Sequence, residues 1–163
     1  MPSLTETYVE NREMILPNHA NTLETAHGGT VLRFMDQVGA MSAMRFAREQ
    51  CVTARMDEVN FKRPIPVGEI ALVKAYVYGS GRTSVRVRTE VYREDPRTAD
   101  TELTTESNIV FVAIDGEGRP TPVPDLTVES DRGRTLHERA LATDGDRDAA
   151  DGGDDGTEGG PNG

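Results

Sequence analysis

A carboxylate stands in the middle of an apolar segment that is preceded by two glycines. In HGGTVLRFMDQVGAMSAMRF, residues 27–46, Asp36 is the only charged residue between Phe34 and Met44. A helix that starts at Gly28-Gly29 exposes free N–H groups and the positive end of its dipole, which could bind an oxyanion. Asp36 lies about two turns further along the same face, where a carboxylate could act as a general base or a nucleophile. One groove could therefore hold a backbone donor for an oxyanion and a carboxylate, whereas a glycine pair before a helix is often only a tight entry to it.

The two faces of this helix differ in side-chain size. We expect the bulky face to pack on a sheet and the small face to admit another helix, a partner subunit or a thin ligand. A partly buried carboxylate is costly unless it is paired or used, whereas an exposed one could be an ordinary surface acid. The bulky face holds Val31, Phe34, Met35, Val38, Met41 and Phe46, and the small face holds Asp36, Gly39, Ala40, Ala43 and Ala47.

The other reactive side chains carry weaker signals. His27 could touch a substrate, but a histidine beside a helix start more often caps or packs it. His19 and His137 have no partners at metal-ligand spacing, so we expect no metal site. Cys51 lies at the start of a predicted strand, and we expect it to be a small buried hydrophobic residue.

Around this segment the apolar period changes from 3.6 to 2, which predicts strands after one long helix. The helix should run from Gly28 to about Glu49. The link Gly79-Ser80-Gly81 predicts a hairpin, and hairpin links favour an antiparallel sheet. The fold class is therefore α+β, with one long helix on a curved antiparallel sheet. Strands are expected at 7–16, 51–61, 69–79, 82–92 and 103–115, and a short exposed helix near 130–142.

Composition bounds the remaining possibilities. The 163 residues suit one domain with a core, and the net charge of −10 disfavours nucleic acid or an anionic membrane as partner. Residues 144–163 hold seven acids and seven glycines, so we expect a disordered acidic tail. No targeting segment or membrane span is visible, which predicts a cytoplasmic protein. Sixteen arginines beside two lysines, with many acids, suggest a salt-loving cytoplasm.

Four sequence blocks, in order and spacing, closely resemble the hotdog-fold acyl-CoA thioesterases of the cytosolic acyl-CoA hydrolase type. The resemblance covers roughly Leu16 to Leu126, and we assign residues 1–126 to the hotdog domain and 127–143 to a C-terminal extension. The blocks are LPNHANTLETAHGGTVLRFMDQVGA, VTARMDEVNFKRPIPVGE, GSGRTSVRVRTEVY and FVAIDGEGRPTPVP.

The resemblance implies hydrolysis of acyl-CoA to fatty acid and CoA, without a metal or other cofactor. It implies a homodimer, assembling into a hexamer as a trimer of dimers, with active sites at the dimer interface. Asn21 and Asp36 match the two catalytic residues, which opposite subunits supply. His27, Gly28 and Gly29 match the region that holds the thioester carbonyl.

The family also places the CoA nucleotide near two turns of this chain. Arginine suits bidentate phosphate binding, although an exposed arginine in a solvated hairpin would look the same. The matching residues are Asn60, Lys62 and Arg63 in the second block, and Gly81, Arg82, Thr83 and Ser84 in the predicted hairpin.

Two rival functions stay open on the same fold. A hotdog hydratase or dehydratase pairs an acid with a catalytic histidine, and the long helix here contains no histidine after its start. A non-catalytic CoA- or acyl-CoA-binding regulatory module would share the fold without the chemistry.

Overall fold

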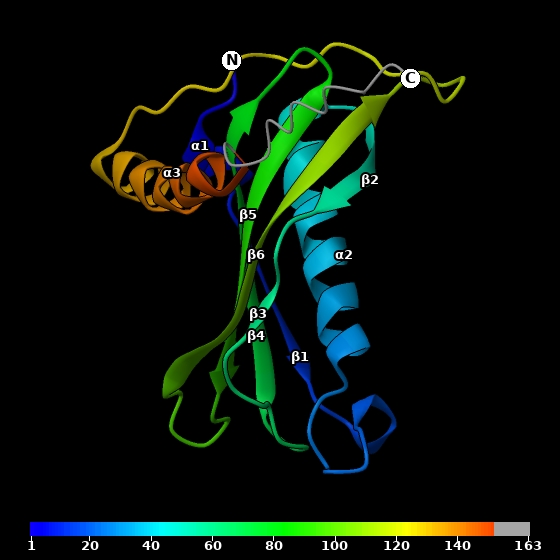
Figure 1. The fold of residues 1–163 in the computed structure, drawn as a ribbon, viewed down its shortest axis with the longest axis vertical. Helices are drawn as coiled ribbons and strands as arrows, with labels where there is room; N and C mark the ends of the chain where they lie inside the picture. Colours follow the sequence, from blue (N-terminus) through cyan, green and yellow to red (C-terminus); the bar gives the residue numbers. More distant parts are fainter. Residues whose placement is uncertain (152–163) are drawn as a thin grey trace, which may run out of the picture.

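One antiparallel sheet curves around one long helix in the computed structural model, which describes residues 1–151 (Figure 1). The strand order is β1-β4-β5-β6-β2, and β3 pairs with β6 further along the edge that β2 occupies. This arrangement confirms the predicted α+β class. The elements are α1 (Leu4–Thr7), β1 (Val9–Met14), the 3₁₀ turn η1 (Pro17–His19), α2 (Gly28–Ala47), β2 (Gln50–Met56), β3 (Asn60–Phe61), β4 (Ile70–Ser80), β5 (Ser84–Glu94), β6 (Thr101–Ile114) and α3 (Asp131–Asp151).

The predicted hairpin is present between β4 and β5, but its turn lies at residues 81–83, two residues after the predicted link, because Gly79 and Ser80 still pair with β5. The Gly81 N–H donates to the Ser84 carbonyl at 2.9 Å and closes the turn. A Cβ at Gly81 would stand 2.5 Å from Ser84 Oγ, so only glycine fits this position without a shift. The hairpin thereby fixes the register of β4 against β5 at the centre of the sheet.

The single strand predicted over 51–61 is divided into β2 and β3. A bulge between Thr53 and Arg55 shifts the register against β6. Asp57 then leaves the ladder, and its N–H donates to the Asn108 carbonyl at 2.9 Å. The interruption bends this edge of the sheet around the helix, which period-2 alternation alone does not show.

The buried face of α2 is wider than predicted and includes three of the five residues of the small face. Gly39, Ala43 and Ala47 are buried together with Val31, Phe34, Met35, Val38 and Phe46. A Cβ on Gly39 would meet the Phe111 ring at 3.2 Å, because the helix approaches the sheet closely there. Met41, predicted to face the sheet, is 44% exposed. Small residues therefore serve close helix–sheet packing, and Asp36 lies at the margin of the buried face.

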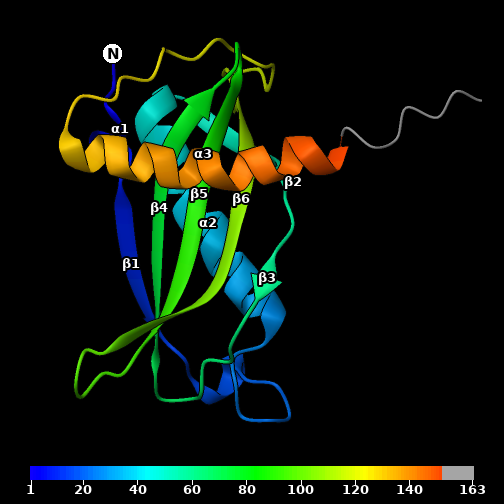
Figure 2. The ribbon, with the colours of Figure 1, turned by 60° about the vertical axis from the view of Figure 1, so that its left-hand side comes forward.

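The outer face of the sheet is crossed by α3 (Figure 2). The Tyr76 hydroxyl donates to the Leu136 carbonyl at 2.8 Å, and a second small core joins Leu4, Tyr76, Tyr78 and Ala140. The Ser130 hydroxyl accepts from the Gly133 N–H at 2.9 Å and caps the helix start. The predicted helix near 130–142 is thus present and packs on the sheet.

The end of α3 lies beyond the predicted boundary at residue 143. Asp144, assigned to a disordered tail, accepts from Asn108 Nδ2 at 3.2 Å and pairs with Arg86 at 3.3 Å. Polar groups on the outer face of the sheet hold it, a long-range contact that composition does not reveal. The helix continues to Asp151, and the rest of the predicted tail, 152–163, lies outside the described residues.

Helix α1 at the start of the chain was not predicted. Its signal is the spacing of Ser3 and Glu6, since the Ser3 N–H donates to the Glu6 carboxylate at 2.9 Å as in a capping box. Within residues 1–151, none of the helices is both long enough and apolar enough to cross a bilayer.

Candidate active site

Asp36 is held by a residue that the sequence analysis missed. The Thr53 hydroxyl, on the edge strand β2, donates to Asp36 Oδ1 at 2.5 Å. Asp36 is half-buried at the margin of the α2 core face, whereas Thr53 is exposed. One carboxylate oxygen is therefore oriented by the sheet while the side chain stays accessible from the open edge. The only sequence signal for Thr53 is its place in the VTARMDEVNF block.

Asn21 lies in the loop before α2 and holds that loop together. Its Oδ1 accepts from the Leu23 N–H at 2.9 Å and the Thr25 N–H at 3.2 Å. Its Nδ2 donates to Thr25 Oγ1 at 3.0 Å. Asp36 lies about 12 Å along the helix axis from Gly28, at 1.5 Å per residue. The described chain contains no bond between Asn21 and Asp36.

The start of α2 is capped by His27. Its Nδ1 accepts from the Gly29 N–H at 3.2 Å, which confirms the capping role and uses one of the two N–H groups predicted to be free. The imidazole must be unprotonated at Nδ1 to accept this bond. Within the part of the chain that the structure describes, the Gly28 N–H has no partner. Gly28, and not Gly29, is therefore the available donor for an oxyanion.

A pocket of about 260 Å³ opens beside the helix start. It brings the predicted residues Gly28, Lys62 and Arg63 together. Phe61, 53% exposed, supplies apolar area at its mouth. The lining residues are Thr25, Ala26, Gly28, Val31, Phe61, Lys62, Arg63, Pro64, Ile65 and Thr105.

Both basic residues of this pocket pair with acids on β6. Lys62 Nζ lies 2.9 Å from Glu106 Oε1, and Arg63 Nε lies 2.6 Å from Glu102 Oε1. Asn60, on β3, stands opposite Glu106 in the register and is exposed. These pairs fix where the two cations stand beside the pocket.

The predicted hairpin contacts lie away from this pocket in one chain. Ser84 pairs with Val112 on β6, whereas Asn60 pairs with Glu106, so the two turns are about 20 Å apart along the strand. Thr83 uses its carbonyl to accept from the Ala113 N–H at 3.0 Å. Arg82 is exposed, and it forms no ion pair with the side chains described in residues 1–144. A single chain thus does not join the two halves of the predicted CoA site.

The remaining reactive groups support no other chemistry. Burial, with the nearby Glu49 charge, raises the pKa of the Cys51 thiol to about 11, so this cysteine is a poor nucleophile. Among the described residues, no three His, Cys, Asp or Glu side chains are grouped so that they could hold a metal ion.

The long helix, curved sheet and helix-margin aspartate define a hotdog thioesterase fold, and comparison with known proteins agrees. Residues 23–99 match the family model described as the thioesterase superfamily. The chain is 33% identical, over 136 residues, to the uncharacterized acyl-CoA thioester hydrolase YkhA of Bacillus subtilis, covering 83% of this chain and 79% of that protein. The chain belongs to the acyl-CoA thioester hydrolases of the thioesterase superfamily.

Solved structures of acyl-CoA thioesterases have the same fold, and some of them contain CoA ligands. The chain matches an apo-hexameric acyl-CoA thioesterase with a TM-score of 0.81 and 33% identity, covering 92% of this chain and 97% of that one. It matches the acyl-CoA hydrolase of Staphylococcus aureus, in complex with butyryl-CoA, CoA and CoA disulfide, with a TM-score of 0.81 and 31% identity, covering 91% and 90%. Variants of that hydrolase carry alanine for one asparagine, one aspartate or one threonine.

Proposed function

We propose that this protein hydrolyses acyl-CoA thioesters at a site that two copies of the chain build together, with Asp36 and Thr53 from one copy and Asn21 from the other. The observation that carries the proposal is the Thr53–Asp36 hydrogen bond at the open edge of the sheet. The three residues replaced in the Staphylococcus aureus hydrolase are spaced 15 and 17 positions apart, as Asn21, Asp36 and Thr53 are here.

The chemistry follows from what each group can do. The Gly28 N–H, at the positive end of α2, polarises the thioester carbonyl and stabilises its oxyanion. Asp36 either takes a proton from the attacking water or attacks the carbonyl to give an anhydride that water then opens. In both routes the C–S bond breaks, and CoA leaves as a thiolate that takes up a proton. Because a thioester lacks amide resonance, these steps require no cofactor.

The separation along α2 favours a site shared between chains. A carbonyl at Gly28 and a carboxylate about 12 Å further along the same helix cannot meet within the roughly 3 Å that attack requires. Asn21 is likewise bound within its own loop at the helix start. A second copy whose helix start lies against the first copy's β2 edge would bring Gly28 and Asn21 to Asp36.

Exposed apolar side chains on both surfaces that would meet support such a pairing. Val52 on β2 is 46% exposed and Leu23 in the Asn21 loop is 79% exposed, and an unpaired strand edge is otherwise a liability. The matched structures include hexameric thioesterases, one of them y2039 of Yersinia pestis. We propose a homodimer that assembles into a hexamer, in which the partner's hairpin at Arg82 joins Lys62 and Arg63 around CoA.

The test is complementation between two inactive variants, followed by thiol release from acyl-CoA. Asp36→Asn and Asn21→Ala should each lower kcat by about 100-fold or more, with little change in the melting temperature of Asp36→Asn. Mixed and reassembled, they should recover about a quarter of wild-type activity, because half of random dimers hold one intact site of two. No recovery would place both residues in one chain's site. Wild-type binding of CoA without thiol release would instead favour the regulatory module.

The amino-acid composition supports a proposal for where the protein works and at what salt concentration. The net charge of −10 and the excess of arginine over lysine suit a protein that works in a salty cytoplasm, where salt screens acidic repulsion. We propose a cytoplasmic role in fatty acyl metabolism, without nucleic acid as partner. Activity that rises between low salt and about 2 M KCl would support this setting, and a monotonic loss would contradict it.

A further inference from the structure

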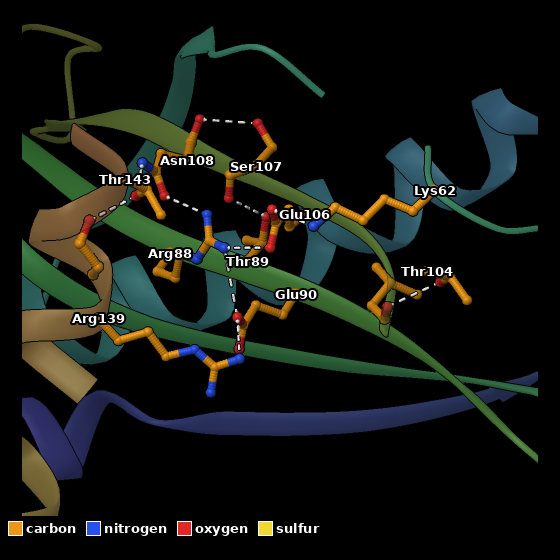
Figure 3. Close-up of polar contacts among 12 residues, drawn as sticks. Lys62, Arg88, Thr89, Glu90, Thr104, Glu106, Ser107, Asn108, Arg139 and Thr143 are labelled. Atoms are coloured by element: carbon orange, nitrogen blue, oxygen red, sulfur yellow. Dashed lines mark hydrogen bonds and ion pairs between the residues drawn. The ribbon is translucent and has the colours of Figure 1, made fainter. Parts of the chain in front are cut away.

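A chain of alternating charges runs across the outer face of the sheet from the pocket to α3 (Figure 3). Lys62 Nζ lies 2.9 Å from Glu106, whose second oxygen lies 2.7 Å from Arg88 Nη2. The same guanidinium lies 3.5 Å from Glu90, which Arg139 of α3 approaches at 2.8 Å. Each carboxylate is thus shared between two cations.

The middle of this chain is rigid because it is buried. The side chains of Arg88 and Glu90 are each 4% exposed, and Arg88 Nη1 also donates to Asn108 Oδ1 at 3.2 Å. Burial raises the pKa of Glu106, but the Lys62 hydrogen bond and the Arg88 charge outweigh it and leave this pKa below its ordinary value. Glu106 therefore stays ionised near neutral pH, held between one fixed and one exposed cation.

The balance of charge along these ion pairs leaves a net positive charge at Lys62. Two carboxylates face three cations, so Glu106 is already largely neutralised by Arg88. Lys62 is consequently held in place by a carboxylate that cancels only part of its charge. Such a cation keeps its attraction for an anion while it loses less rotational freedom on binding.

We propose that Glu106, backed by the buried Arg88, is a positioning residue that fixes Lys62 for a phosphate group of CoA; this inference rests on the proposed function. Glu106 itself does not touch CoA. The neighbouring pair offers a contrast, since Glu102 has a 43% exposed side chain and no buried cation behind it among the described residues. Glu102 should therefore contribute charge beside Arg63 but no comparable anchoring.

The experiment measures CoA affinity by calorimetry in the full-length protein. Glu106→Gln should weaken CoA binding by about fivefold, because Lys62 loses its anchor although the pocket gains a positive charge. Glu102→Gln removes the same charge from the same strand, and it should leave affinity unchanged or increase it. Equal shifts in one direction for both variants would overturn the inference, because only bulk electrostatics would then be acting.

A double-mutant cycle with Lys62→Met decides whether Glu106 acts through Lys62. Lys62→Met alone should weaken CoA binding by about fivefold to tenfold, and adding Glu106→Gln should then change little. Additive losses would refute positioning. If Glu106→Gln does not fold, Glu106→Asp keeps the charge beside Arg88 and withdraws the carboxylate from Lys62.

Two further readouts separate this inference from the proposed function. The KM for acyl-pantetheine, which lacks the nucleotide phosphates, should not respond to Glu106→Gln. Failure of the thioesterase proposal would appear as CoA binding without thiol release, and the calorimetric cycle would remain decisive. Absence of any CoA binding by the wild type would refute both.

Discussion

Replacing Gly39 by valine should test whether close packing of α2 on the sheet sets the position of Asp36. Even a Cβ at Gly39 would stand 3.2 Å from the Phe111 ring and 3.4 Å from the Thr89 methyl group. Valine adds two more methyl groups, so the helix must move outward or Phe111 must turn. Overpacking of this kind costs about 1–3 kcal/mol, more than the few tenths that leaving glycine restores in helix propensity.

The same displacement should reach the catalytic pair. Asp36 lies one turn before Gly39, and its bond to Thr53 spans the gap between helix and sheet at 2.5 Å. An outward shift of about 1 Å would break that bond, and misplacement on this scale can lower kcat by about 100-fold. The melting temperature should fall by roughly 3–10 °C for a chain of this size.

The assays are thiol release from acyl-CoA and thermal unfolding, with Gln37→Val as the matched control. Gln37 is exposed on the same helix, so its replacement introduces the same β-branched side chain without contact to the sheet. The control should retain kcat and melting temperature within experimental error. Wild-type kcat in Gly39→Val would show that helix–sheet spacing does not position Asp36.

Three further outcomes follow from the charged and titrating groups. Arg88→Leu leaves two carboxylates with one cation fewer and should lower the free energy of unfolding in urea by about 3–5 kcal/mol; a loss below about 1 kcal/mol would contradict the importance of the buried pair. Because the pKa of Glu106 is depressed from 4.5 in the folded chain, its stabilisation is complete above that pH and is lost as the pH falls through the folded value. The melting-temperature gap between wild type and Glu106→Gln should thus be constant above about pH 4.5 and narrow below it. With a pKa of about 11 against an ordinary 9.0, Cys51 should react with iodoacetamide at pH 8 about 100-fold more slowly than in the unfolded chain, and equal rates would refute its burial.

Much of the fold could be predicted because local patterns specify it. The 3.6 period after Gly28 predicts the long helix, and the Gly-Ser-Gly link predicts the β4–β5 hairpin, both of which the structure contains. The strand predicted at 82–92 is present as β5, and its period of 2 places Val85, Val87 and Val91 in the core under α2.

What could not be predicted depends on contacts between distant parts of the chain. A helical wheel separates a bulky sector from a small one, but it does not say that Gly39 packs against Phe111 while Met41 stays exposed. Thr53 is an ordinary strand residue until the fold places it against Asp36. Glycines at a helix start suggest two free N–H groups, and only the structure shows that His27 occupies that of Gly29.

The position of α3 has a consequence for the order of folding. In residues 1–151 the last strand ends at Ile114, so the sheet can form before α3 packs on it. Before α3 docks, Arg88 and Glu90 face water on the outer surface of the sheet. Docking of α3 removes this water, and Arg139 then provides a second cation for Glu90. We therefore expect dehydration of this ion pair to accompany the docking of α3, and we expect α3 to detach before the sheet unfolds.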